Sequence, residues 1–259
     1  MVRKLRWLKI VASVGVAWLA ASANPAQAEP NRLTADEQAH GWKLLFDGES
    51  TAGWRGMKGT PFPSQTWMIA DGAIGTKEDG SGGDLVAEQK FSNFELLVEW
   101  KISPGGNSGI KYLVQEEWLS PHFQPDLPEN QKRNQWLSAV GPEFQVYDDE
   151  KMRRRPGWEL SSTGAFYLIH SPQNKQVNPP GEWNLARIVV RGNHVEHWLN
   201  GSKLLEYELG SPELLALVEK TKFRKVPGFG IKGPGHIVLQ HHGSPAWFRN
   251  IKIRELMPE

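Results

Sequence analysis

The chain has 259 residues, of which 39% are hydrophobic and 23% are charged, and this ordinary composition excludes disordered and fibrous proteins. The absence of Cys excludes disulfides, thiolate zinc sites and cysteine nucleophiles. The chain contains 12 Trp, and these flat apolar side chains can form either core layers or platforms on which sugar rings stack.

The N-terminal segment predicts an export signal. Four basic residues within positions 3–9 precede a short apolar run at 10–21, and Ala26-Gln27-Ala28 has the small-residue pattern of a cleavage site. An uncleaved anchor is the alternative, although the run is short for a membrane span. Residues 1–28 carry four basic and no acidic side chains, so their removal changes the formal net charge from +1 to −3.

A weakly acidic domain is not expected to bind nucleic acid. No later segment has the roughly 18 apolar residues of a membrane helix, so no membrane contact is expected after cleavage. We therefore expect a periplasmic or secreted protein, cleaved after Ala28, with a short N-terminal extension at 29–40 and one domain at 41–257.

The mature chain is expected to form many short strands separated by turns. Residues 94–102 alternate between apolar and polar side chains, and Asp71-Gly72 and Asn200-Gly201 are two-residue hairpin signals. Strands are predicted at 41–48, 66–70, 94–102, 109–115, 143–147, 165–169, 185–191, 195–199, 203–208, 236–240 and 246–255. Strands at this spacing with Gly and Pro turns predict an all-β sandwich or jelly roll.

Helical signals are few. Thr34 and Glu37 have the spacing of a capping box, which opens a short helix to about His40. Residues 212–220 form the second candidate, with Ser211 as N-cap and Pro212 in the first turn. Residues 118–142 form a long polar stretch without such signals, and long loops are often functional.

The glycine-rich segment at 103–110 (SPGGNSGI) follows the longest alternating strand. It lacks the lysine and the following helix of a phosphate-binding loop. Two interpretations are open: a plain hairpin turn, or a tight connection that exposes Asn107, Ser108 and Lys111 in a cleft.

The segment GPEFQVYDD at 141–149 places Glu143, Gln145 and Tyr147 on one strand face, opposite Phe144 and Val146. This polar row is either the floor of a groove or a solvated outer face. The spacing is similar to the E-x-D-x-E strand of retaining glucanases, but here it reads E-x-Q-x-Y. Two-carboxylate glycoside hydrolysis needs an acid and a nucleophile or base, so ordinary glycanase chemistry is not expected on this strand.

Histidines near the C-terminus are further candidates. His241 and His242 are adjacent, so on a strand they would point to opposite faces, and either an acid–base or a structural role fits. His194 and His197 lie in or beside a turn and are expected at the surface. No H-x-H or H-E-x-x-H element supports a zinc site.

No cofactor is expected, although a Ca²⁺ ion held by Asp148, Asp149 or Glu150 is an option. The basic run at 153–155 (RRR) is either a solvated loop or a clamp for an anion or uronate.

Several motifs in order give the chain a resemblance to the 3-keto-disaccharide hydrolase domain family, from about Gly41 to Leu256. Each motif alone is weak, but their order is specific. The motifs are GWKLLFDG with a later GW; W-x-x-x-D-G-x-I; GGDLVAEQKFSNFELLVEWKISPGGNSGIKY; GPEFQVYDDE; STGAFY; PPGEWN; WLNG; and LQHHGSPAWFRNI.

The resemblance implies a concanavalin A-like jelly-roll sandwich that acts on glycosides already oxidised at carbon 3 of the sugar. A ketone there acidifies the proton on carbon 2, so a base can remove it and the glycosidic oxygen can leave. Such a hydrolase or lyase needs one base, oxyanion-stabilising donors and an acid, rather than two matched carboxylates.

The resemblance places Glu143 and His242 in characteristic motifs, so either is a candidate base, with Lys111 as the third catalytic candidate. Many family members have Asp where this chain has His241. The candidates for substrate binding are Asn107, Gln145, Tyr147, Trp54, Trp67, Trp136 and Arg249, with core packing as the alternative for each Trp. The expected partner is a small carbohydrate. The alternative function is a non-catalytic carbohydrate-binding jelly roll.

Overall fold

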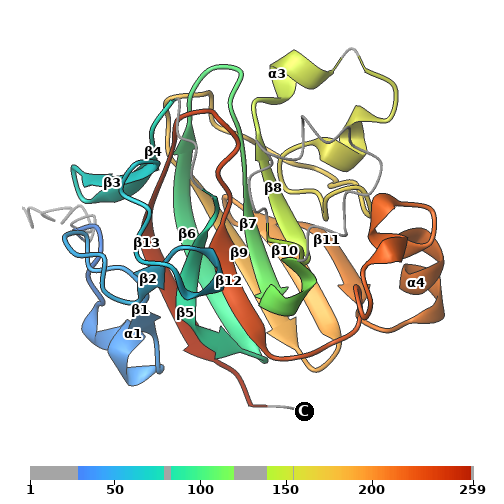
Figure 1. Cartoon of the computed structure of the whole chain (residues 1–259), viewed down its shortest axis with the longest axis horizontal. Coiled ribbons are helices and arrows are strands. Elements are labelled where there is room, and N and C mark those ends of the chain that lie inside the picture. The colour runs from blue at the N-terminus through green and yellow to red at the C-terminus, as the bar shows by residue number, and fades with distance from the viewer. Residues whose placement is uncertain (1–28, 79–82, 120–138, 154, 258–259) are drawn as a thin grey trace, which may run out of the picture.

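The computed structural model describes residues 29–78, 83–119, 139–153 and 155–257, and these form two antiparallel sheets packed face to face (Figure 1). Within these residues the larger sheet has eight strands, ordered β11-β10-β9-β6-β13-β4-β3 with β1 also paired to β13, and the smaller has five, ordered β2-β5-β12-β7-β8. The arrangement confirms the predicted all-β jelly-roll sandwich.

The strands of the larger sheet are β1 (Lys43–Leu44), β3 (Trp67–Ala70), β4 (Ala73–Thr76), β6 (Phe94–Ile102), β9 (Asn184–Arg191), β10 (His194–Leu199), β11 (Ser202–Glu208) and β13 (Ala246–Glu255). Those of the smaller sheet are β2 (Trp54–Arg55), β5 (Leu85–Phe91), β7 (Asn107–Val114), β8 (Glu143–Tyr147) and β12 (Gly235–Leu239).

The core lies between the two sheets. Strand β6 has the predicted bounds, and its even-numbered apolar side chains are buried against those of the smaller sheet. Strand β8 also forms over the predicted residues, with Phe144 and Val146 in the core. Because side chains alternate along a strand, Glu143 and Gln145 lie on the outer face of the smaller sheet.

Besides the two-residue β2, which was not predicted, three segments differ from the strand predictions. Strand β5 was not predicted because three exposed polar residues, 88–90, interrupt its apolar pattern. The strand expected at 41–48 shortens to β1, and a turn follows in which Asp47 accepts hydrogen bonds from the backbone. The segment 165–169 is not a regular strand, although Phe166 forms isolated bridges with Phe144 and His170.

Helices are short. The predicted capping box is present at α1 (Ala35–Ala39), and Ser211 caps α4 (Pro212–Val218) as predicted. The remaining helical turns are η1 (Met57–Gly59), η2 (Glu116–Leu119), α3 (Asp149–Met152), η4 (Trp158–Ser161) and η5 (Lys222–Lys225). Helices α1 and α4 lie on opposite sides of the sandwich (Figure 1). Among the described residues, no helix has the length and apolarity needed to cross a membrane.

The glycine-rich segment connects the two sheets rather than forming a hairpin, since β6 and β7 belong to different sheets. A Cβ atom on Gly106 would overlap the Ile102 side chain, and Gly105 has a φ of 68°. The tight passage between sheets therefore needs glycine at both positions.

The prediction that His197 is a surface residue is wrong. His197 is fully buried between the sheets, where its Nε2 lies 2.6 Å from the Tyr112 hydroxyl and its Nδ1 lies 3.0 Å from the Gly164 carbonyl oxygen. The Tyr112 hydroxyl also contacts that of Tyr207 at 2.5 Å. Burial lowers the pKa of His197 to about 4, so the imidazole is a neutral member of a core hydrogen-bond network.

Candidate active site

A row of side chains crosses the outer face of the smaller sheet. The strand registers place Val86, Val238, Lys111 and Glu143 side by side on β5, β12, β7 and β8. Beyond β8, the bridge between Phe144 and Phe166 continues the row. The predicted polar face of β8 therefore meets Lys111 on the neighbouring strand.

Glu143 is the buried carboxyl group of this row, and it is only 5% exposed. Its carboxylate lies over Gly109, where a Cβ atom would overlap it. Burial raises the pKa of Glu143 to about 7; the positive charge of Lys111 opposes the rise, the negative charge of Asp84 adds to it, and Lys222 opposes it. A carboxyl group with a pKa near neutrality can both accept and return a proton at physiological pH.

Lys111 is held in place by Asp84, which the sequence did not single out. The Lys111 Nζ atom donates to Asp84 Oδ2 at 2.9 Å and to the Ala139 carbonyl oxygen at 2.9 Å, and each side chain of the ion pair is 2% exposed. Asp84 also accepts hydrogen bonds from the backbone N–H groups of Ala139 and His241. Asp84 thus fixes a positive charge beside Glu143.

Tyr167 lies on the other side of Glu143. Its backbone N–H donates to the Glu143 carbonyl oxygen at 3.2 Å, so the two residues are opposite each other in the register set by Phe144 and Phe166. Phe166 belongs to the core, and Tyr167 is half-buried at its edge, close enough to Glu143 for the two groups to interact electrostatically. Burial raises the pKa of the Tyr167 phenol, and the Glu143 charge raises it further.

The other predicted polar residues of this face are present but differ in exposure. Asn107 lies opposite Tyr147 at the entry to β7, and both are half-buried. Gln145 is 3% exposed, and its Oε1 accepts a hydrogen bond from the Val146 N–H group. Ser108, from the same glycine-rich segment, is buried and donates to the Gln240 carbonyl oxygen. Asn107, Gln145 and Tyr147 thus share a face with Glu143.

His241 and His242 follow the end of β12, and their side chains lie in different environments. His241 is buried against the Trp67 ring, with the ring centroids 6.5 Å apart, whereas His242 is exposed. Glu143 pairs with Lys111 in the strand register, whereas His242 lies beyond the end of β12 on an exposed segment.

The structure places three of the predicted sugar-binding residues elsewhere. Trp54 and Trp67 are 3% and 1% exposed, and their indole N–H groups donate to the carbonyl oxygens of Leu45 and Gly83. Both rings belong to the core and present no free face. Arg249 lies on β13 of the other sheet, where its guanidinium pairs with Glu99 at 2.7 Å. Trp136 lies outside the described residues.

Several tryptophans lie on the outer face of the larger sheet. There Trp183 lies under the Arg249 guanidinium at 4.1 Å, and Lys101 lies 4.8 Å from the centroid of the same ring. Trp198 and Trp42 have Arg187 and Arg254 over their rings at 4.7 and 5.0 Å. These indoles contribute to a lattice of cation–π contacts on that face.

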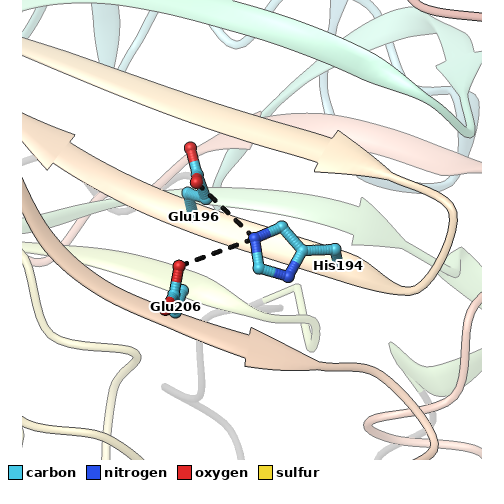
Figure 2. A group of neighbouring side chains, drawn as sticks. All are labelled: His194, Glu196 and Glu206. Carbon is cyan, nitrogen blue, oxygen red and sulfur yellow. Dashed lines mark ion pairs between the residues drawn. The ribbon is translucent and has the colours of Figure 1, made fainter.

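A group of possible metal ligands lies on the β10–β11 hairpin, on the larger sheet. His194 Nε2 is 3.5 Å from Glu196 and 3.7 Å from Glu206 (Figure 2), but the Lys203 ammonium also pairs with both carboxylates. The group is thus a mixed ion-pair network on a partly exposed surface.

The carboxylates considered for Ca²⁺ have protein partners. Asp148 accepts from the Gly105 N–H group, and Asp149 pairs with Lys175 at 2.6 Å. Glu150 pairs with Arg153, the first residue of the basic run, and both are exposed.

Comparison with known proteins defines the class. The sandwich is similar to a crystal structure from Parabacteroides distasonis ATCC 8503 of a protein assigned as a glycosyl hydrolase, with a TM-score of 0.72, 34% identity, and 88% of this chain and 100% of that chain covered. A second such structure from the same organism has a TM-score of 0.58 and 26% identity, and covers 83% of this chain and 99% of that chain. Fold and relatives place the chain among carbohydrate-cleaving enzymes.

The chain belongs to the 3-keto-alpha-glucoside-1,2-lyase-like domain family, whose model matches residues 41–254. It is 38% identical over 253 residues to a 3-keto-disaccharide hydrolase of Bacteroides thetaiotaomicron (strain VPI-5482), covering 88% of this chain and 83% of that protein. The resemblance inferred from the ordered motifs is therefore confirmed.

Proposed function

We propose that this protein is an exported enzyme that cleaves 3-keto-glycosides, with Glu143 as the general base. The observation that supports this most is the buried Glu143 carboxyl group, whose pKa is near 7, between Lys111 on one side and Tyr167 on the other. One such base with cations around it suits proton abstraction next to a ketone.

The reaction proceeds by elimination. Glu143 takes the proton from carbon 2, and the electron pair of that C–H bond forms the enolate of the 3-ketone. The ketone re-forms as the bond between carbon 1 and the glycosidic oxygen breaks, which leaves a double bond between carbons 1 and 2. The departing oxygen takes up a proton. Water then adds its hydroxyl to carbon 1 and its hydrogen to carbon 2, so the net reaction is hydrolysis.

Ordinary two-carboxylate hydrolysis is disfavoured. The carboxylate whose charge raises the pKa of Glu143 is that of Asp84. Its oxygens already accept hydrogen bonds from the Lys111 ammonium and from the backbone N–H groups of Ala139 and His241. A nucleophile or base for an unoxidised glycoside needs a free carboxylate about 5–9.5 Å from its partner. The tryptophan content and the missing second carboxylate favoured the binding-module alternative, and of its candidate platforms Trp54 and Trp67 are core residues.

Export remains part of the proposal. Close to the predicted cleavage site, Asn31 exchanges hydrogen bonds with Asn250 of β13 and donates to the Gly72 carbonyl oxygen. Removal of residues 1–28 therefore leaves these anchoring contacts intact. N-terminal sequencing of protein secreted from its host should begin at Glu29, and a retained residue 1 would contradict the proposal.

The catalytic proposal is tested with matched substrates. Purified protein should release the second unit from at least one 3-keto-disaccharide and should leave the parent disaccharide intact. Glu143→Gln should slow the release by roughly 10²- to 10⁴-fold, the usual contribution of a positioned base. Cleavage of the unoxidised disaccharide at a similar rate, or an unchanged rate in Glu143→Gln, would rule out this chemistry.

A further inference from the structure

The segment after α4 contributes a positively charged side chain to the face that holds Glu143. Lys222 begins the turn η5, and its ammonium lies 5.0 Å from the centroid of the Tyr167 ring and 5.4 Å from that of Phe223. Helix α4, which precedes it, lies on the same side of the molecule as β8 and β11 (Figure 1). A residue far along the chain thus reaches the row formed by Lys111, Glu143 and Tyr167.

Two aromatic rings fix the position of this ammonium. The rings of Tyr167 and Phe223 meet edge to face at 6.3 Å, and Phe223 is stacked on Phe229 at 4.2 Å with nearly parallel planes. Thr221 caps the turn by accepting a hydrogen bond from the Phe223 N–H group. A lysine on such a rigid aromatic support loses less freedom when it binds a ligand than a lysine on a loop.

Lys222 has an unusual combination of surroundings. It is solvent-exposed, yet surrounding protein atoms lower its pKa, while the Glu143 charge raises that pKa and Lys111 lowers it. Within the part of the chain that the structure describes, no carboxylate lies within ion-pair distance of its ammonium. Its hydrogen-bond donors are therefore open to a ligand, in contrast to those of Lys111, which already donates to Asp84 and Ala139.

We propose that Lys222 is a catalytic residue that donates a hydrogen bond to the negatively charged oxygen formed at carbon 3, and that Tyr167 is the positioning residue that holds it there. This inference rests on the proposed elimination. Glu143 takes the carbon-2 proton, and the electron pair moves toward the carbon-3 oxygen. An ammonium on the same side as Glu143, beyond Tyr167 in the row, can stabilise that charge as it develops.

The contacts of the two lysines indicate different roles. Lys111 is buried and ion-paired with Asp84 on one side of Glu143, and Lys222 is solvent-exposed on the other side. The charged groups that act on the pKa of Glu143 are thus Lys111, Asp84 and Lys222. Among these, Lys222 alone is solvent-exposed within the described residues.

The test uses Lys222→Met in the full mature chain, because an exposed lysine can be replaced without disrupting the core. With a 3-keto-disaccharide that the wild-type protein cleaves, kcat should fall roughly 10²-fold or more, the usual cost of removing one oxyanion donor, and KM should change little. The acid limb of the pH profile should move to higher pH, because the Lys222 charge lowers the pKa of Glu143. Lys222→Arg should recover part of the rate.

Controls separate the possible outcomes. Lys220→Met removes an equally exposed charge two residues away and should leave kcat unchanged. Tyr167→Phe keeps the ring and should stay near the wild-type rate, whereas Tyr167→Leu should lose part of kcat; a Tyr167→Phe variant as slow as Lys222→Met would overturn the positioning role.

A wild-type protein that cleaves its substrate, with Lys222→Met equally fast, overturns the role of Lys222 and leaves the proposed function standing. A wild-type protein that cleaves no 3-keto-disaccharide overturns the proposed function. In that case the pH dependence of unfolding still measures the pKa of Glu143, and a value unchanged in Lys222→Met would also remove the electrostatic contact proposed for Lys222.

Discussion

Replacement of Glu143 by Gln should make the protein more stable at alkaline pH, and the gain can be worked out from the burial of the carboxyl group. Burial raises the pKa of Glu143 from 4.5 to about 7. At about 1.36 kcal/mol per pKa unit, the ionised carboxylate costs the folded state about 3 kcal/mol. Glutamine has nearly the same shape and no charge, so it avoids this cost.

The sign of the effect depends on pH. Between pH 4.5 and 7 the folded protein keeps a proton on Glu143 that the unfolded chain has lost, so the free energy of unfolding of the wild type falls as the pH rises through this window. The fall is complete above about pH 8. The Glu143→Gln variant lacks this contribution. Its free energy of unfolding, relative to that of the wild type, should therefore increase by about 3 kcal/mol from pH 4 to pH 8.5.

Urea unfolding of both proteins at pH 4, 5.5, 7 and 8.5 measures this difference, because the titrating groups away from Glu143 are shared and cancel. Glu49→Gln, which replaces an exposed carboxylate, is the matched control and should show no comparable gain. If the difference between Glu143→Gln and the wild type is the same at every pH, then Glu143 is not a buried carboxyl group with a raised pKa, and its assignment as a base loses its physical basis.

Three further predictions concern the site and the core. On a 3-keto-disaccharide substrate, kcat/KM should rise with pH and level off above about 7, the pKa of the Glu143 carboxyl group; a rate that is flat from pH 5 to 8 would contradict this. Gly109→Ala should displace the Glu143 carboxylate and reduce kcat at least about 10-fold, as loss of catalytic geometry does, whereas Gly233→Ala, whose Cβ would make an ordinary contact, should not. Trp67→Phe should lower the free energy of unfolding by about 1–3 kcal/mol through the lost hydrogen bond to Gly83 and the smaller ring, with KM unchanged; a raised KM with normal stability would return Trp67 to the substrate site.

Alternation along single strands was sufficient to predict the polar face of β8. Glu143, Gln145 and Tyr147 share a face because side chains alternate with period two, and the burial of Phe144 and Val146 bears this out. The jelly-roll class could be predicted for the same reason, since turn signals and alternating segments recur along the whole chain.

Lys111 was a candidate from the sequence, but Asp84 and Lys222 could not be predicted as partners of the site, because their positions depend on which segments are neighbours in the fold. Asp84 lies 27 positions before Lys111 in the sequence. The two residues come together only because the sheet order places β5, which follows Asp84, one strand away from β7, with β12 between them. Lys222 belongs to a surface turn whose local sequence, KFRK, gives no sign of the ring of Tyr167. No local pattern in the sequence distinguishes Asp84 or Lys222 from the other charged residues of the chain.

The tryptophans show a second limit of sequence patterns. A strand of only two residues, such as β2, offers no alternation from which the direction of Trp54 could be read. Trp67 begins β3 and is buried, whereas Trp247 on β13 is only half-buried, with the Lys101 ammonium 5.0 Å from its ring centroid. The packing of the two sheets, rather than local composition, decides which indole is a core residue.

The most direct test of the central claim is turnover in D₂O. If Glu143 removes the carbon-2 proton and water later adds across the double bond, the sugar released from a 3-keto-disaccharide should contain one deuterium bound to carbon 2, as measured by mass spectrometry and NMR. A sample of the product sugar incubated without enzyme corrects for spontaneous exchange. Sugar released without deuterium at carbon 2 would contradict elimination and would indicate direct displacement at carbon 1.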